Sequence, residues 1–105
     1  MINVDMAKAR RESIRWTVLL ILNNARPVMT HENLVLTTMQ GIYADATAME
    51  MRRELDYLEE RELVKIKREP SGAWFAELTR LGVDVAEYTV DVEPGIARPT
   101  KYWPG

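Results

Sequence analysis

Residues 45–82 constrain the fold more than any other part of the chain. Apolar residues recur there at helical spacing from Asp45, a suitable N-cap, to about Arg61, and predict a helix. Two alternating segments, 63–69 and 73–78, flank a Pro-Ser-Gly turn signal and predict a hairpin. Thr79 predicts the N-cap of a short helix, about 80–88. The residues expected to be buried are Ala48, Met51, Leu55 and Leu58 in the first helix, and Leu81, Val85 and Ala86 in the second.

Two further helices are predicted before this stretch. The first covers about residues 7–24, and Pro27 prevents it from continuing. Val28 and Met29 suit a very short strand, and Thr30 suits the N-cap of a helix over 31–40, with Gly41 at its left-handed end. The residues expected to be buried are Ile14, Val18, Ile21 and Leu22 in the first helix, and Leu34, Val35 and Met39 in the second.

The length of the chain fits one domain, residues 1–88, followed by a tail, residues 89–105. Three prolines predict that the tail is extended, and Tyr102 and Trp103 predict that it docks on a partner. The apolar run 16–22 is too short to span a bilayer. The N-terminal sequence lacks the layout of a signal peptide. We therefore expect a cytoplasmic protein with no membrane partner.

Catalytic and metal chemistry are not expected. The chain has no cysteine, and its one histidine, His31, is expected to be an exposed residue of a first helical turn rather than a metal ligand. No nucleophile elbow or phosphate-binding loop is present in the sequence. We expect neither an enzyme nor a protein that holds a cofactor or metal.

The predicted order of elements indicates an α+β, mainly α, fold: a three-helix core, a two-stranded wing hairpin, a short fourth helix and an extended C-terminal tail. Residues 55–64 (LDYLEERELV) and 77–82 (ELTRLG) are similar to the winged helix-turn-helix repressors of the ArsR, MarR and PadR type. The resemblance covers about residues 16–88. The size and the proline-rich tail also resemble small winged-helix proteins of Mu-like prophages.

The chain departs from these families at two points. Glu62 stands where the families have a glycine, and a side chain in a left-handed position costs roughly 1 kcal/mol. The cysteines with which ArsR proteins sense metals are absent, so metal sensing is not implied.

The resemblance implies a small dimeric transcriptional regulator that binds double-stranded DNA. The helix that follows Asp45 would enter the major groove, the hairpin would contact phosphates, and a basic N-terminal arm would add further phosphate contacts. The candidate residues are Thr47, Met49, Arg52 and Arg53 on the helix, Lys65, Lys67, Arg68, Ser71 and Gly72 on the hairpin, and Lys8, Arg10, Arg11 and Arg15 in the arm.

An alternative function is a winged-helix protein–protein interaction module, such as an adaptor in a phage or bacterial assembly, without nucleic acid. Glu50, Glu54 and Asp56 are expected on the outer face of the groove helix, where acids are repelled by phosphate, and the net charge of −2 points the same way. Under either function a homodimer is expected, because Trp16, Leu19 and Leu20 give the first helix more apolar surface than its core stripe needs.

Overall fold

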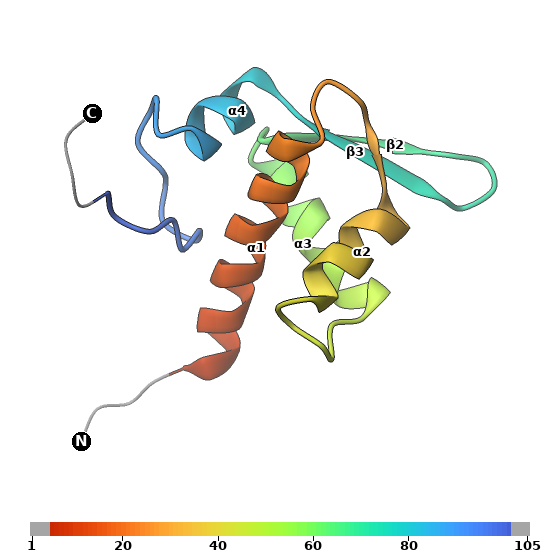
Figure 1. Ribbon diagram of the computed structural model, residues 1–105, viewed down its shortest axis with the longest axis horizontal. Helices are drawn as coiled ribbons and strands as arrows, with labels where there is room; N and C mark the ends of the chain where they lie inside the picture. The colour runs from red at the N-terminus through yellow and green to blue at the C-terminus, as the bar shows by residue number, and fades with distance from the viewer. Residues whose placement is uncertain (1–4, 102–105) are drawn as a thin grey trace.

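The computed structural model describes residues 5–101 and has an α+β, mainly helical fold (Figure 1). Within this range there are four helices and one antiparallel three-stranded sheet, whose strand order is β1-β3-β2. The elements are α1 (Met6–Asn24), β1 (Thr30–His31), α2 (Glu32–Gln40), α3 (Ala48–Glu60), β2 (Val64–Arg68), β3 (Trp74–Leu78) and α4 (Arg80–Ala86).

The predicted hairpin is confirmed. Strands β2 and β3 pair in register from Val64 opposite Leu78 to Arg68 opposite Trp74. Gly72 adopts a φ of 95° in the turn, a conformation that glycine takes without a steric penalty. The hairpin projects away from the helices (Figure 1).

The first strand lies two residues later than predicted. β1 consists of Thr30 and His31, which pair with Ala76 and Phe75 of β3. Val28 is still part of the turn after α1, because its backbone N–H donates to the carbonyl of Ala25. The short strand predicted at Val28 and Met29 is therefore wrong by two positions.

Two predicted N-caps are also wrong. Helix α2 is capped by His31, whose Nδ1 accepts a hydrogen bond from the backbone N–H of Asn33, while the predicted cap Thr30 is buried in β1. Helix α3 is capped by Thr47, whose Oγ1 accepts from the N–H of Glu50, so the helix begins three residues after Asp45. His31 is half-buried against Phe75, with ring centroids 4.9 Å apart, and is not the exposed residue expected.

Gly41 is not left-handed, contrary to expectation. Its φ is −64°, an ordinary right-handed value. Glu62, in contrast, adopts a φ of 64°, as its position after α3 predicted.

The core lies where the three long helices meet the sheet. Its fully buried side chains include Ile14, Val18, Val35, Met39, Met51, Leu55 and Leu58, all predicted from helical spacing. Three predicted core residues are exposed instead: Leu34 (59%), Leu81 (44%) and Ala48. Ala48 is the first residue of α3.

Most of the apolar surface on α1 is covered within the chain. Trp16 and Leu19 are buried, and Trp16 packs edge-on against the ring of Tyr88, with centroids 5.8 Å apart. Of the three residues on which the dimer expectation rested, only Leu20 remains exposed, at 38%.

Residues 89–101 contain no helix or strand, and they lie against the domain rather than apart from it (Figure 1). The N–H of Ala97 donates to the carbonyl of Glu12 in α1, at 3.1 Å. Arg98 donates to the carbonyl of Val85 in α4, and Val92 and Ile96 pack on the core. The docking predicted for Tyr102 and Trp103 lies outside the described residues. Among residues 5–101 no helix has the length and apolar composition to cross a membrane.

Candidate nucleic-acid interface

Helix α3 carries an outward-facing stripe next to the hairpin. Met49 and Arg53, one helical turn apart, lie on this stripe, and the side chain of Met49 is 72% exposed. Arg53 is exposed and forms no ion pair within residues 5–101. These two predicted site residues are free to meet a partner. Thr47 is exposed at the start of α3, but its hydroxyl oxygen already serves as the N-cap.

Arg52, the neighbour of Arg53, is engaged inside the protein. Its Nε and Nη2 donate to the two carboxylate oxygens of Glu32, at 2.6 Å each, and Nη2 also donates to the carbonyl of Gly72 at 2.6 Å. Its guanidinium lies over the ring of Trp74, 4.3 Å from the centroid. Arg52 therefore links α2, α3 and the hairpin tip, and is not available in this structure to read a base.

Glu32 is the centre of this link. Its side chain is only 9% exposed, and its carboxylate also accepts from the backbone N–H of Trp74 at 2.7 Å. The hydrogen bonds from Arg52 are the main cause that lowers the pKa of Glu32. Burial opposes this shift, and the N–H of Trp74 lowers the pKa further. The carboxylate is thus held ionised by its partners.

Arg68 fastens the hairpin to α3 from the other side of Trp74. It donates to Asp56 at 2.8 Å and to Glu59 at 3.0 Å, and its guanidinium lies 4.5 Å from the Trp74 ring centroid. The carboxylate of Glu59 is the first cause of a raised pKa for Arg68. With Arg52 and Arg68 both against Trp74, the position of the hairpin relative to α3 is fixed by side chains.

Lys65 and Lys67 face away from α3. Successive side chains of a strand point to opposite faces, and Val64, Ile66 and Arg68 occupy the face of β2 that turns toward the helix. Both lysines are exposed, and Lys67 forms only a loose pair with Glu69, at 3.6 Å. The structure therefore does not place the predicted lysines and Arg68 on one face of the hairpin.

The hairpin tip is open. Ser71 and Gly72 are exposed, and a Cβ added to Gly72 would meet no atom within 4 Å. The tip is therefore sterically open to a partner, while the N–H of Gly72 donates to the carbonyl of Glu69 and its carbonyl accepts from Arg52.

The basic arm, like α3, contains both ion-paired and unpaired basic side chains. Arg10 donates to Glu50 at 2.7 Å and to Asp45 at 2.9 Å, and this hydrogen bond is the main cause that lowers the pKa of Asp45. Lys8 and Arg11 form no ion pair within residues 5–101. The arm lies in the first three turns of α1 and is not a free segment.

Arg15 forms the most buried pair. Its Nε donates to Glu54 at 2.8 Å, and the side chain of Glu54 is 1% exposed. The guanidinium stacks on the ring of Tyr57 at 3.5 Å from the centroid and donates to the carbonyl of Gly95 at 2.9 Å. Glu54 was expected on the outer face of α3, and this placement is wrong, because it lies between Met51 and Leu58 at helical spacing and so shares their buried side.

The three acids expected to repel phosphate are therefore each matched by an arginine. Glu50 pairs with Arg10, Glu54 with Arg15 and Asp56 with Arg68. Their repulsion is weakened, but the same pairs occupy three of the basic groups expected to attract DNA. Of the predicted site residues on α3 and the hairpin, Arg53 and Lys65 are the basic side chains that form no ion pair within residues 5–101.

The chain matches no protein-family model, and neither a curated protein nor a solved structure is significantly similar to it.

Proposed function

We propose that the chain is a winged helix-turn-helix protein that binds double-stranded DNA, with α3 as its groove-reading helix. The element order α1-β1-α2-α3-β2-β3, with the two long strands as a projecting hairpin, supports this fold. The observation that carries the function is the pair of exposed side chains on α3, Met49 and Arg53. They lie beside a hairpin whose position relative to α3 is fixed by Arg52 and Arg68. A groove helix and a flanking wing in a fixed relation can contact neighbouring parts of one duplex.

The proposed roles differ between the two adjacent arginines. Arg53, with Met49, contacts base edges, since an unpaired guanidinium can donate two hydrogen bonds to guanine. Arg52 positions the hairpin and reads no base. Lys65, Lys67 and the Ser71-Gly72 tip contact phosphates, which supplies affinity without sequence preference.

Alanine variants separate these roles in binding to a selected duplex and to random duplex. Arg53→Ala is expected to weaken binding to the selected sequence by about tenfold or more and to random duplex much less, as loss of a base contact does. The double variant Lys65→Ala/Lys67→Ala is expected to weaken binding to both equally. Arg80→Ala is the matched control, because this arginine is 90% exposed on α4, remote from the hairpin tip (Figure 1). If Arg53→Ala binds both duplexes as the wild type does, the groove role of α3 is wrong.

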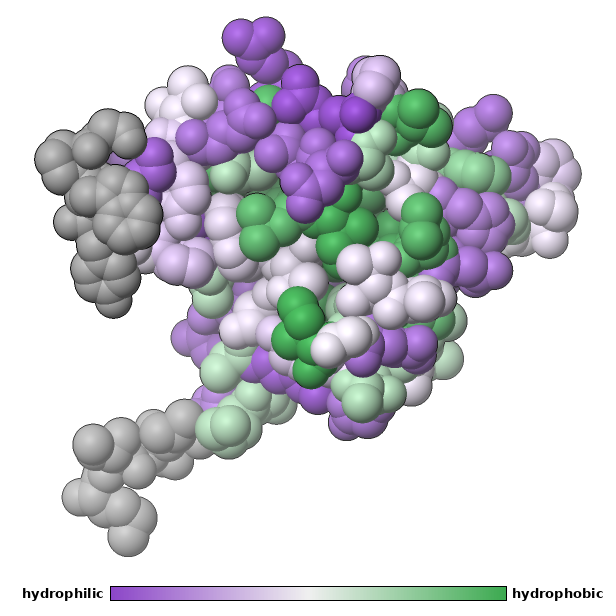
Figure 2. All heavy atoms as spheres, in the orientation of Figure 1, coloured by the Kyte–Doolittle hydropathy of each residue, from purple (hydrophilic) through white to green (hydrophobic). Residues whose placement is uncertain are grey.

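As a regulator, we propose that the protein acts as a homodimer. A groove lined by Ile21, Thr30 and Leu34 lies between α1 and α2, and Val28 beside it is 68% exposed. Figure 2 shows strongly hydrophobic side chains gathered over this face. A second copy of the chain would cover them. Light scattering at micromolar concentration is expected to give a dimer mass for the wild type and a monomer mass for Leu34→Glu; a monomer in both refutes the dimer.

Charge balance favours a second candidate function, a protein-interaction module without nucleic acid. Residues 48–78, which contain α3 and the hairpin, carry six basic and eight acidic side chains, whereas a DNA-binding surface has a clear basic excess. In this case wing-charge variants would leave partner binding intact.

A further inference from the structure

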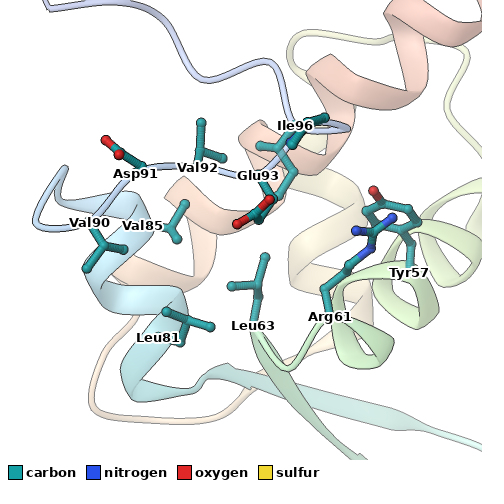
Figure 3. Close-up of a pocket in the computed structure, with 11 residues that line it drawn as sticks. Tyr57, Arg61, Leu63, Leu81, Val85, Val90, Asp91, Val92, Glu93 and Ile96 are labelled. Atoms are coloured by element: carbon teal, nitrogen blue, oxygen red, sulfur yellow. The ribbon is translucent and has the colours of Figure 1, made fainter.

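A cavity of about 300 Å³ lies between the C-terminal end of α3, α4 and residues 90–96 (Figure 3). Its apolar part includes Leu63, Leu81 and Val85, whose side chains project into it. Val92 and Ile96 from the C-terminal segment complete the opposite wall. The volume is at the lower end of the range of small-molecule sites, about 300–1,000 Å³, so a ligand of few atoms fits best.

The wall formed by the C-terminal segment is firmly attached. Arg15 donates to the carbonyl of Gly95, and the N–H of Ala97 donates to the carbonyl of Glu12. Gly95 adopts a φ of 109°, and a Cβ there would collide with the hydroxyl of Tyr57. Because only glycine allows this close approach, the C-terminal segment packs directly against Tyr57 of α3, and both elements line the same cavity.

Two opposite charges border the apolar part. The guanidinium of Arg61 lies against Tyr57, 4.6 Å from the ring centroid, on the α3 side of the cavity. The carboxylate of Glu93 points into the cavity from the C-terminal segment, while the carboxylate of Asp91 turns outward (Figure 3). Neither Arg61 nor Glu93 forms an ion pair in the described part of the chain, and they do not pair with each other.

We propose that this cavity binds a small zwitterion with an apolar side chain, namely a free hydrophobic α-amino acid. The carboxylate would accept from Arg61, the ammonium would donate to Glu93, and the side chain would pack on Leu63, Leu81 and Val85. The geometry favours a zwitterion because an anion alone would leave Glu93 opposing it, and a cation alone would leave Arg61 opposing it. This site is separate from the stripe of α3 and does not depend on DNA binding.

The test is a titration of the ¹⁵N-labelled full chain, followed by NMR, with L-leucine, N-acetyl-L-leucine and L-leucinamide. The two capped compounds lack the ammonium charge and the carboxylate charge respectively. Binding of L-leucine at about millimolar Kd is expected, with shifts at the amides of Leu63, Leu81 and Glu93. Each capped compound is expected to bind about tenfold more weakly, because each loses one charged hydrogen bond.

Two variants make the assignment specific. Arg61→Gln is expected to abolish the preference for L-leucine over L-leucinamide and to keep the preference over the N-acetyl compound; Glu93→Gln is expected to do the reverse. Arg80→Gln on α4, outside the cavity, is the control and should bind as the wild type does. Absence of shifts with L-leucine, or equal binding of all three compounds by the wild type, overturns the proposal.

Discussion

Arg52 and Arg53 are adjacent and chemically identical, but their substitution is expected to affect stability very differently. Arg52 supplies two of the three hydrogen bonds to the buried carboxylate of Glu32, whereas Arg53 supplies none to the described residues. Arg52→Ala would leave Glu32 with only the N–H of Trp74. Removing one partner of a buried pair costs about 3–5 kcal/mol. Arg52 is 35% exposed, so water replaces part of the loss, and we expect a decrease of about 2–3 kcal/mol in the free energy of unfolding.

Urea denaturation followed by circular dichroism measures this difference. Arg52→Ala is expected to lower the melting temperature by about 10–20 °C as well, given about 4–8 °C per kcal/mol for a domain of this size. Arg53→Ala is expected to change the free energy of unfolding by less than about 0.5 kcal/mol, as exposed substitutions usually do. The reasoning is refuted if the two variants are equally stable, because Arg52 would then hold nothing together.

Three further predictions concern the same network and the end of α3. Arg15→Met is expected to lower the free energy of unfolding by about 3 kcal/mol, since Glu54 becomes a buried charge without its partner, and Arg15→Met/Glu54→Met should recover part of it; a double variant less stable than the single one, by urea denaturation, would count against this. Glu62→Gly is expected to leave stability equal or raise it by up to about 1 kcal/mol, because Glu62 is left-handed; a lower melting temperature would contradict this. The lowered pKa of Glu32 contributes stability that is present above its ordinary value of 4.5 and is lost as the pH falls below it, so the wild type should lose more stability between pH 6 and pH 3 than Glu32→Gln does.

The helices and the hairpin could be predicted from the sequence because their signals are local. The spacing of Met51, Leu55 and Leu58 sets the buried face of α3, and the alternation around Ile66 sets the faces of β2. The same spacing places Glu54 on the buried side of α3, whereas its charge favours an exposed position. Helical periodicity was the better guide here, because Arg15 supplies the partner that makes burial possible.

The ion pairs could not be predicted, because their partners are distant in sequence. Arg52 meets Glu32 across 20 residues, and Arg10 meets Glu50 across 40. Such contacts depend on how helices pack, and neither composition nor periodicity reports them. For this reason the sequence alone treated paired arginines such as Arg52 and unpaired ones such as Arg53 as equivalent site residues.

The helix starts were missed for a related reason. Asp45 and Thr47 are both good N-caps, and the choice between them depends on a tertiary contact. Asp45 pairs with Arg10 of α1, which leaves Thr47 to cap α3. The same competition applies wherever two capping residues lie within one turn.

The most direct test of the central claim is binding of the wild-type chain to random-sequence duplex DNA, measured by fluorescence anisotropy at two salt concentrations. If Lys65 and Lys67 make two phosphate contacts, the affinity should fall with a slope of about −1.8 in log salt, or about 12-fold between 50 and 200 mM. A fall of this size would support a winged-helix DNA-binding protein with few free cations. No binding at 50 mM salt would contradict it and favour the protein-interaction module.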